Sequence, residues 1–367
     1  MAKLKLINQL KSYFNSNGIR FNIDEKRAWG FIEKTFGSER TTELGHIFTL
    51  ACNTGNLDSS NKYKFCKNYD EATTLMYFQS DFFLKNSEAI FKEIAHYKPK
   101  KILELGCYTG VFANYIAEQF NNSKILGIDK EINLIEFGKL KFKTHNLELL
   151  NCEYKDLEKI NQKFDFIFTN FGIENIPYKK IIDSYKIREN NNYKIQFDYF
   201  CKFFEYLQNM SLERAIFSCC VRIPRLQTLL SFIDASHTFG WTWLNEKLNG
   251  ISAYSATIPY LVFEKKKSKK MKLSEFFQAI GDYFGQEDYK YAYNYEFNKN
   301  KFFNKLIKDS HTFSDTGHIL YFEVNANNDL FNLFMWSTSG FINYKESRNP
   351  EDIKSYFTEV TKGKLEF

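Results

Sequence analysis

The stretch from Lys101 to Asp129, KILELGCYTGVFANYIAEQFNNSKILGID, decides the fold of this chain. It begins with a short apolar run, Ile102 to Leu105, which is too brief for a helix and typical of a buried parallel strand. A turn bracketed by Gly106 and Gly110 follows, and apolar residues then recur at helical spacing. A second apolar strand ends on Asp129. The order strand, glycine turn, helix and strand predicts half of a nucleotide-binding βαβ unit.

The residue types in this stretch suit a ligand that carries an anionic group and a ribose. Glycine lets backbone N–H groups approach a ligand where a Cβ would clash. The helix start that follows carries partial positive charge and free donors. An acid at the tip of the second strand can accept hydrogen bonds from both ribose hydroxyls. The dinucleotide pattern G-x-G-x-x-G is absent, so a dinucleotide is not the expected ligand.

The turn reads ELGCYTG from Glu104 to Gly110. It resembles motif I of the class I S-adenosylmethionine (SAM) methyltransferases, [DE]-x-G-x-G-x-G, with Tyr108 in place of the middle glycine. The resemblance implies that Glu104, Gly106, Tyr108 and Gly110 form the methionine end of a SAM site. The backbones of Gly106 and Tyr108 would lie close to the cofactor, and Glu104 would order the turn. The alternative is an ordinary strand-to-helix turn in another α/β fold.

Three segments are expected along the chain. Residues 1–98 predict a helical N-terminal cap, residues 99–267 the SAM-binding methyltransferase domain, and residues 271–367 a C-terminal α+β domain. The middle segment ends in two strands, 251–255 and 258–264, whose short link forces antiparallel pairing. The expected fold is therefore α/β: a doubly wound, mostly parallel sheet of seven strands with a terminal antiparallel hairpin. In the last domain, strands at 318–324 and 330–336 and helices at 273–284 and 351–360 are expected.

Further cofactor contacts are expected where successive strands end, because open α/β sheets bind ligands there. The resemblance implies that Asp129 grips the ribose hydroxyls, although an aspartate at a strand end is also a common helix N-cap. It implies that Glu153 contacts the adenine amino group and that Tyr154 flanks the adenine ring. These assignments extend the site from the glycine turn across the next two strands.

The segment after the fourth expected strand reads NFGIENIP from Asn170. By resemblance, Asn170 and Phe171 would wall the cofactor, and Glu174 would act as a base or positioning acid on the substrate side. The segment lacks the [DNS]-P-P-[FY] motif of amino-methylating DNA enzymes and the Pro-Cys pair of C5-cytosine enzymes. DNA is therefore not the expected acceptor.

Composition narrows the class of protein further. The 367 residues carry a net charge of +6, and the main basic run is Lys265 to Lys270, interpreted as a solvated linker. The seven cysteines include no C-x-x-C pair, so neither a disulfide framework nor a metal site is expected. The start of the chain lacks the apolar core of a secretory signal, and no apolar run reaches membrane-spanning length. A cytoplasmic protein without a membrane segment is expected.

The expected function is methyl transfer from SAM to an O or N atom of a small molecule or of a peptide or protein acceptor, leaving S-adenosylhomocysteine (SAH). The C-terminal domain would serve substrate recognition or dimerisation, which leaves a homodimer open. Three alternatives remain: an RNA methyltransferase that uses the basic surface, a catalytically inactive SAM-binding scaffold subunit in which Tyr108 replaces the glycine, and another SAM-dependent chemistry such as aminopropyl transfer. Salt-sensitive RNA binding would distinguish the first of these.

Overall fold

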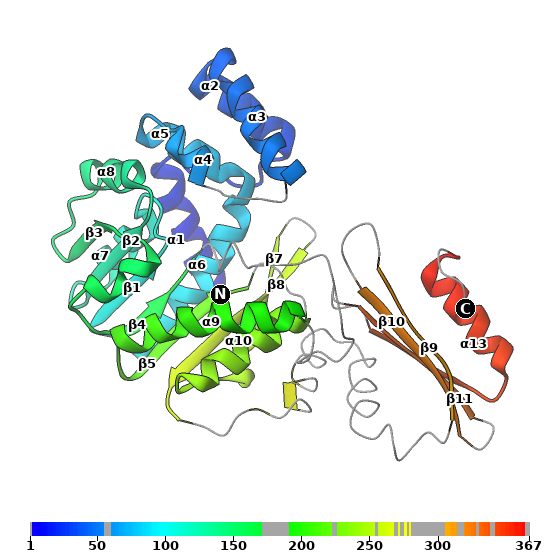
Figure 1. Cartoon of the computed structure of the whole chain (residues 1–367). Coiled ribbons are helices and arrows are strands. Elements are labelled where there is room, and N and C mark those ends of the chain that lie inside the picture. The colour runs from blue at the N-terminus through cyan, green and yellow to red at the C-terminus, as the bar shows by residue number, and fades with distance from the viewer. Residues whose placement is uncertain are drawn as a thin grey trace. The chain divides into compact units, whose positions relative to one another are not determined.

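The structure is a computed structural model that describes residues 2–54, 60–170, 191–221, 226–253, 256–267, 271, 275–276, 279, 305–313, 319–327, 330–337 and 342–363. The chain divides into two compact units. The first comprises residues 1–176, 202–222 and 239–267, and the second comprises residues 177–201, 223–238 and 268–367. Each unit is described by itself (Figure 1).

The first unit is built on an eight-stranded sheet in the order β3-β2-β1-β4-β5-β8-β6, with β7 paired to β8. Its strands are β1 (Lys101–Leu105), β2 (Lys124–Asp129), β3 (Leu147–Asn151), β4 (Phe164–Phe168), β5 (Ser211–Cys220), β6 (Trp241–Trp243), β7 (Asn249–Ala253) and β8 (Ala256–Lys265). The first five strands pair in parallel, and β8 runs antiparallel to each of its partners. The expected mostly parallel α/β sheet is therefore confirmed.

The end of this sheet differs from the expectation of seven strands. The expected hairpin forms, with Ile251 opposite Ile258 across β7 and β8. A further strand, β6, pairs Trp243 with Phe263 on β8. Because β5 occupies one edge of β8, β6 and β7 share the other edge in succession. The sequence did not reveal β6 because three residues are too few to show strand alternation.

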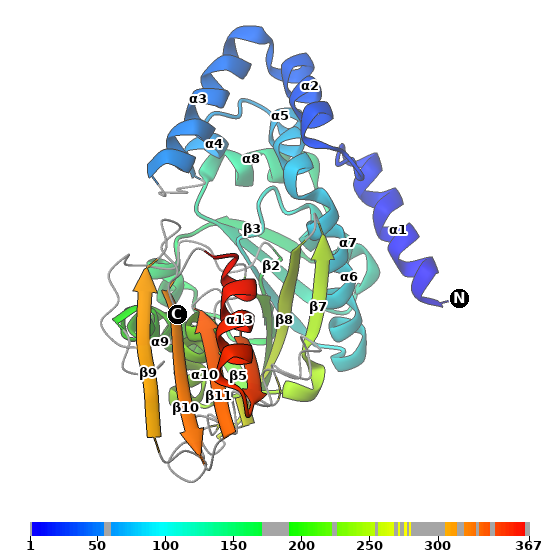
Figure 2. The ribbon, with the colours of Figure 1, turned by 90° about the vertical axis from the view of Figure 1, so that its right-hand side faces the viewer.

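Helices surround the sheet and form most of the N-terminal region. They are α1 (Ala2–Ser16), α2 (Glu25–Phe36), α3 (Ser38–Thr54), α4 (Ser60–Lys64), α5 (Tyr69–Leu75), η1 (Met76–Gln79), α6 (Ser80–Tyr97), α7 (Val111–Gln119), α8 (Ile132–Lys141), η2 (Tyr154–Lys159), α9 (Asn191–Met210) and η4 (Asn245–Lys247). Both views place α4 and α5 beside α8, which follows β2 (Figures 1 and 2). The N-terminal helices therefore reach the end of the sheet where β2 stops.

One aromatic chain joins the N-terminal helices to the sheet. Phe14 on α1 contacts Phe83 on α6, with ring centroids 4.9 Å apart. Phe83 contacts Phe112 on α7 at 6.3 Å, and Phe112 contacts Phe168 on β4 at 5.7 Å. All four rings are at most 1% exposed. Such contacts add to the burial of large apolar surfaces, so the helices and the sheet share one hydrophobic core.

The second unit contains the first part of α9, α10 (Leu226–Thr238), a four-stranded antiparallel sheet and α13 (Pro350–Thr361). Its strands are β9 (Lys305–Phe313), β10 (Ile319–Asn327), β11 (Leu330–Ser337) and β12 (Ile342–Ser347), in the order β12-β11-β10-β9. The expected strands near 318–324 and 330–336 and the helix after Pro350 are confirmed. Most of the helix expected at 273–284 lies outside the described residues. Among the helices that the structure describes, none combines the length and the apolar character that a membrane span requires.

Candidate functional site

The turn between β1 and α7 has an unusual backbone. Gly106, Tyr108 and Gly110 all have positive φ angles, of 65°, 60° and 75°. Glycine adopts this left-handed region at no steric cost, but for a tyrosine it is unfavourable. The N–H of Cys107 donates to the carbonyl of Ile128 at 2.8 Å, and this hydrogen bond joins the turn to β2. The sequence therefore positions the turn directly beside the end of the second strand.

Close packing behind the turn explains two glycines. A Cβ added to Gly110 would lie 2.5 Å from Leu149 Cδ2 on β3. A Cβ added to Gly138 on α8 would lie 2.2 Å from the carbonyl oxygen of Thr109 in the turn. Gly138 requires glycine because the close atom belongs to the backbone. Gly110 requires it because its φ of 75° lies in the left-handed region in addition to the contact with Leu149. The sequence had indicated Gly110 but not Gly138, whose role depends on how α8 packs against a distant turn.

Asp129 is held at the end of β2 by two backbone donors. Its Oδ2 accepts a hydrogen bond from the N–H of Tyr108 and its Oδ1 accepts one from the N–H of Glu131, each at 2.9 Å. The side-chain amide of Asn151 on β3 donates to the Asp129 carbonyl at 3.0 Å. Burial raises the pKa of this carboxyl to about 6, and the bonds from Glu131 and Tyr108 oppose that rise. Each carboxylate oxygen keeps a lone pair that can accept a ligand hydroxyl.

Glu104, the acid of the expected motif, is 1% exposed. Neither of its carboxyl oxygens has a hydrogen-bond partner of good geometry among the described residues. Burial raises its pKa well above the ordinary value, the Ala113 backbone opposes that rise, and the charge of Asp129 adds to it. A backbone hydrogen bond from Ala113 of poor geometry satisfies such a buried carboxyl group only in part, which is costly unless something else pairs with it. It therefore fits a ligand that brings a cationic or hydrogen-bond-donating group to this turn.

The side chain of Tyr108 packs among the N-terminal helices. It is 3% exposed, and its hydroxyl donates to the carbonyl of Ala72 on α5 at 2.6 Å. Its ring meets the edge of Tyr63, with centroids 4.9 Å apart. Burial raises the pKa of the phenol well above its ordinary value, so the hydroxyl stays protonated and remains a donor. The replacement of the middle glycine thus connects the turn to the helices.

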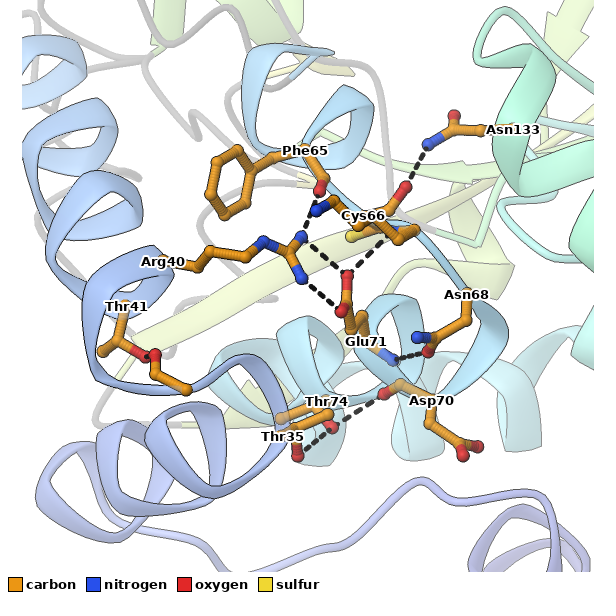
Figure 3. A network of polar contacts seen from close by, with 12 residues as sticks. Thr35, Arg40, Thr41, Phe65, Cys66, Asn68, Asp70, Glu71, Thr74 and Asn133 are labelled. Atoms are coloured by element: carbon orange, nitrogen blue, oxygen red, sulfur yellow. Dashed lines mark hydrogen bonds and ion pairs between the residues drawn. The ribbon is translucent and has the colours of Figure 1, made fainter.

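Residues 63–68, which are the last two residues of α4 and the linker to α5, are called the strap. The guanidinium of Arg40 on α3 donates to the carbonyl of Phe65 at 2.7 Å and pairs with the carboxylate of Glu71, Nη2 to Oε2, at 2.9 Å (Figure 3). The same carboxylate accepts a hydrogen bond from the N–H of Lys67 at 2.7 Å. One partly buried ion pair therefore holds the strap at Phe65 and at Lys67.

The strap is also tied to α8, next to Asp129. The amide of Asn133 donates to the carbonyls of Tyr63 and Cys66, at 2.7 and 3.1 Å (Figure 3 shows the second bond). Asn133 lies four residues after Asp129 in the chain. The sequence offered no signal for these contacts, because Asn133 and the strap are about 70 residues apart.

The other expected site residues have different surroundings. Glu153 is exposed and lines a cavity of about 480 Å³ along β3, together with Lys130 and Asn151. Asn170 is fully buried, and its side chain donates to Ser87 Oγ on α6 at 2.7 Å. Their contacts with a cofactor stay predictions. Tyr154 begins η2, but its side chain, Phe171 and Glu174 lie outside what the structure describes.

The described residues contain no group of three or more His, Cys, Asp or Glu side chains that could hold a metal ion. The polar groups that converge at the turn are instead two carboxyls and backbone donors, from Glu104, Asp129, Tyr108 and Glu131. This set can bind hydroxyl and ammonium groups of an organic ligand.

Comparison with known proteins agrees with this arrangement. Residues 102–186 match the family described as Methyltransferase domain. A malonyl-[acyl-carrier protein] O-methyltransferase of Ilyobacter polytropus is 34% identical over 125 residues, which are 33% of this chain and 44% of that protein. A demethylmenaquinone methyltransferase of Geobacillus stearothermophilus is 26% identical over 113 residues, 30% of this chain and 47% of that protein. The chain thus spans less than half the length of these relatives.

The solved structures that are similar to this chain share little sequence with it. The magnesium protoporphyrin IX methyltransferase of Synechocystis with bound SAM is 10% identical, with a TM-score of 0.39 over 59% of this chain and 96% of that one. The family match covers β1 to β4 and thus the glycine turn and Asp129. On that match, residues 102–186 form a domain of the class I S-adenosylmethionine-dependent methyltransferase superfamily.

Proposed function

We propose that this protein is a SAM-dependent methyltransferase that methylates an O or N atom of a small molecule or of a peptide or protein acceptor. The observation that carries the proposal is the carboxylate of Asp129, which two N–H groups fix beside the glycine turn within the matched domain. This is the group that would recognise the ribose of the cofactor.

The residues present fit the cofactor at both ends of this turn. The buried carboxyl of Glu104 would pair with the amino group of the methionine part, directly or through water. The open backbone at Gly106, with its φ of 65°, would let that part approach closely. Asp129 would accept hydrogen bonds from the ribose hydroxyls, since among the described residues each oxygen accepts one backbone hydrogen bond and keeps a further lone pair.

When bound, SAM supplies a methyl group on a positively charged sulfur that is already activated for displacement. The chain's own contribution is therefore to position the acceptor and to exclude water. A base is needed only where the acceptor must lose a proton before it attacks. Glu174 is proposed for that role or for positioning the acceptor, from its place in the segment after β4.

The relatives support an acceptor other than DNA without fixing its identity. Their names describe methylation of malonyl-[acyl-carrier protein] and of demethylmenaquinone. These are a carrier-bound carboxylic acid and a quinone, so the matched domain type serves chemically distinct acceptors. The same limit applies to this chain, because the family match covers only residues 102–186 and the aligned stretches cover about a third of the chain.

Two measurements test the proposal. Calorimetry with SAH should show binding to the full chain, and Asp129→Ala should weaken it while Glu136→Gln, an exposed acid on α8, should not. Tritiated SAM with fractionated cell extract should then transfer label. Label in small molecules or protein would support the proposal, and label in RNA would favour the RNA alternative. Tight SAH binding without transfer to any fraction would favour the inactive scaffold, and no binding of SAM or SAH would refute the proposal.

A further inference from the structure

Tyr108 connects three parts of the first unit that are far apart in the sequence. Its N–H donates to Asp129 at 2.9 Å, its hydroxyl donates to Ala72 on α5 at 2.6 Å, and its ring packs edge-on against Tyr63 of the strap. Resting on the proposed function, we propose that Tyr108 is a positioning residue. By anchoring the glycine turn to the N-terminal helices, it holds its own N–H against the carboxylate that receives the cofactor's ribose.

The backbone of Tyr108 gives the physical reason for an anchor. A φ of 60° is unfavourable for a residue with a Cβ, by about 1 to 2 kcal/mol. The conformation persists only if the surroundings favour it. The buried hydroxyl bond to Ala72 and the contact with Tyr63 provide this, because both would be lost if the ring turned away. A glycine here would need no such support, but it would also leave the turn free to move.

The structure that receives the Tyr108 ring is itself fastened. Ala72 follows Glu71, whose carboxylate pairs with Arg40 of α3. The carbonyl of Tyr63 accepts a hydrogen bond from Asn133 of α8. The N-terminal helices therefore offer a fixed surface from which Tyr108 can hold the turn. Through this residue, the position of the helices determines how the Asp129 carboxylate is presented.

The ionisation of Asp129 offers a readout of this coupling. The N–H of Tyr108 is one of two hydrogen bonds that favour the charged form of the carboxylate, the other being that of Glu131. The remaining groups that face Asp129 are Glu131 and Lys130 after β2, Glu104 on β1 and Cys107 in the turn. If the Tyr108 N–H moves away, the pKa of Asp129 should rise while these neighbours stay in place.

The test compares Tyr108→Phe, which removes only the hydroxyl, and Tyr108→Gly, which restores the glycine of the motif, with Tyr77→Phe. Tyr77 is a matched control because it is also buried and its hydroxyl donates to a backbone carbonyl, that of Gly18, at 2.9 Å. Gly18 lies between α1 and α2, outside the glycine turn. Carbon-13 NMR of aspartate carboxyls, in the unliganded protein, follows the pKa of Asp129, and calorimetry follows SAH affinity.

We expect both Tyr108 variants to raise the pKa of Asp129, by roughly 0.5 to 1, and to weaken SAH binding about 2- to 10-fold. Tyr77→Phe should lower thermal stability to a similar extent as Tyr108→Phe and leave both readouts unchanged. An unchanged Asp129 pKa in both Tyr108 variants, or an equal change in Tyr77→Phe, would overturn the inference. Since the NMR titration needs no cofactor, it remains decisive even if the wild-type protein fails to bind SAH, a result that would refute the proposed function instead.

Discussion

Arg40 and Glu71 form an ion pair in which the guanidinium side chain is 19% exposed and the carboxylate only 5%. Each partner makes one further hydrogen bond. Arg40 donates to the Phe65 carbonyl, and Glu71 accepts from the N–H of Lys67. Its hydrogen bonds with Glu71 raise the pKa of Arg40. Because these contacts fasten the strap that Tyr108 packs against, the pair supports the site without belonging to it.

Replacing Arg40 with Met should reduce the free energy of unfolding by about 2 to 4 kcal/mol, because a buried carboxylate loses its partner. Urea denaturation measures the change. Arg27→Met is the control, because the ion pair of Arg27 with Asp24 is 70% and 61% exposed and should contribute less than about 1 kcal/mol. Equal decreases in the free energy of unfolding of the two variants would show that the Arg40–Glu71 pair stabilises the protein no more than an exposed ion pair does.

Gly138→Ala should destabilise the first unit and weaken SAH binding, because the new Cβ would press on the Thr109 carbonyl in the glycine turn. Gly30→Ala in α2 is the matched control, since no atom lies within 4 Å of a Cβ placed there. Alanine favours a helix over glycine, so this control should gain up to about 1 kcal/mol of stability. Thermal unfolding measures both, and a neutral Gly138→Ala would contradict the close packing of α8 against the turn.

Glu104→Gln should change how stability depends on pH. Burial raises the pKa of Glu104, so folding disfavours its ionised form. The stability associated with this raised pKa is present below the ordinary pKa of a glutamate and is lost as the pH rises through the raised value. The wild-type protein should therefore be less stable at about pH 8 than at about pH 5, and the variant should reduce that difference.

Urea unfolding at the two pH values tests this, with Glu136→Gln, an exposed acid, as the control. The variant should also bind SAH more weakly, because glutamine cannot pair with an ammonium group through a full charge. A variant with wild-type pH dependence would mean that Glu104 is not the group responsible.

SAH affinity should fall on the acid side of neutrality. The pKa of Asp129 is raised to about 6, and its charged form is the better acceptor for ribose hydroxyls. Affinity should be constant well above that value and decrease as the pH falls through it. Asp129→Asn should bind SAH roughly 10- to 100-fold more weakly at about pH 8. Its affinity should not decrease further as the pH falls through about 6. If the affinity of the variant for SAH still decreased at acid pH, the titrating group would be another one, such as a histidine.

Local sequence patterns predicted the framework of this site well. The apolar runs of β1 and β2, the glycines between them and the acid after the second strand lie within 29 residues, from Lys101 to Asp129. Strand alternation, turn chemistry and helix periodicity all act over such short distances. The hairpin of β7 and β8 and the helix that begins at Pro350 were predictable for the same reason.

Long-range contacts could not be predicted in this way. Tyr108 bonds a carbonyl 36 positions away, and Arg40 pairs with a carboxylate 31 positions away. No local pattern distinguishes these side chains from other tyrosines and arginines in the chain. The three residues of β6 are too few to show strand alternation, and only their pairing with β8 identifies them as a strand.

The sequence by itself determined that a strand, a glycine turn, a helix and a terminal acid follow one another, because hydrophobic periodicity and glycine's freedom are local properties. Only the tertiary structure decided where Tyr108 points and which helices hold the strap over the turn. Those outcomes depend on which surfaces meet when the N-terminal helices bury their apolar faces against the sheet. The turn is thus encoded by its own residues, whereas the presentation of Asp129 depends on the packing around it.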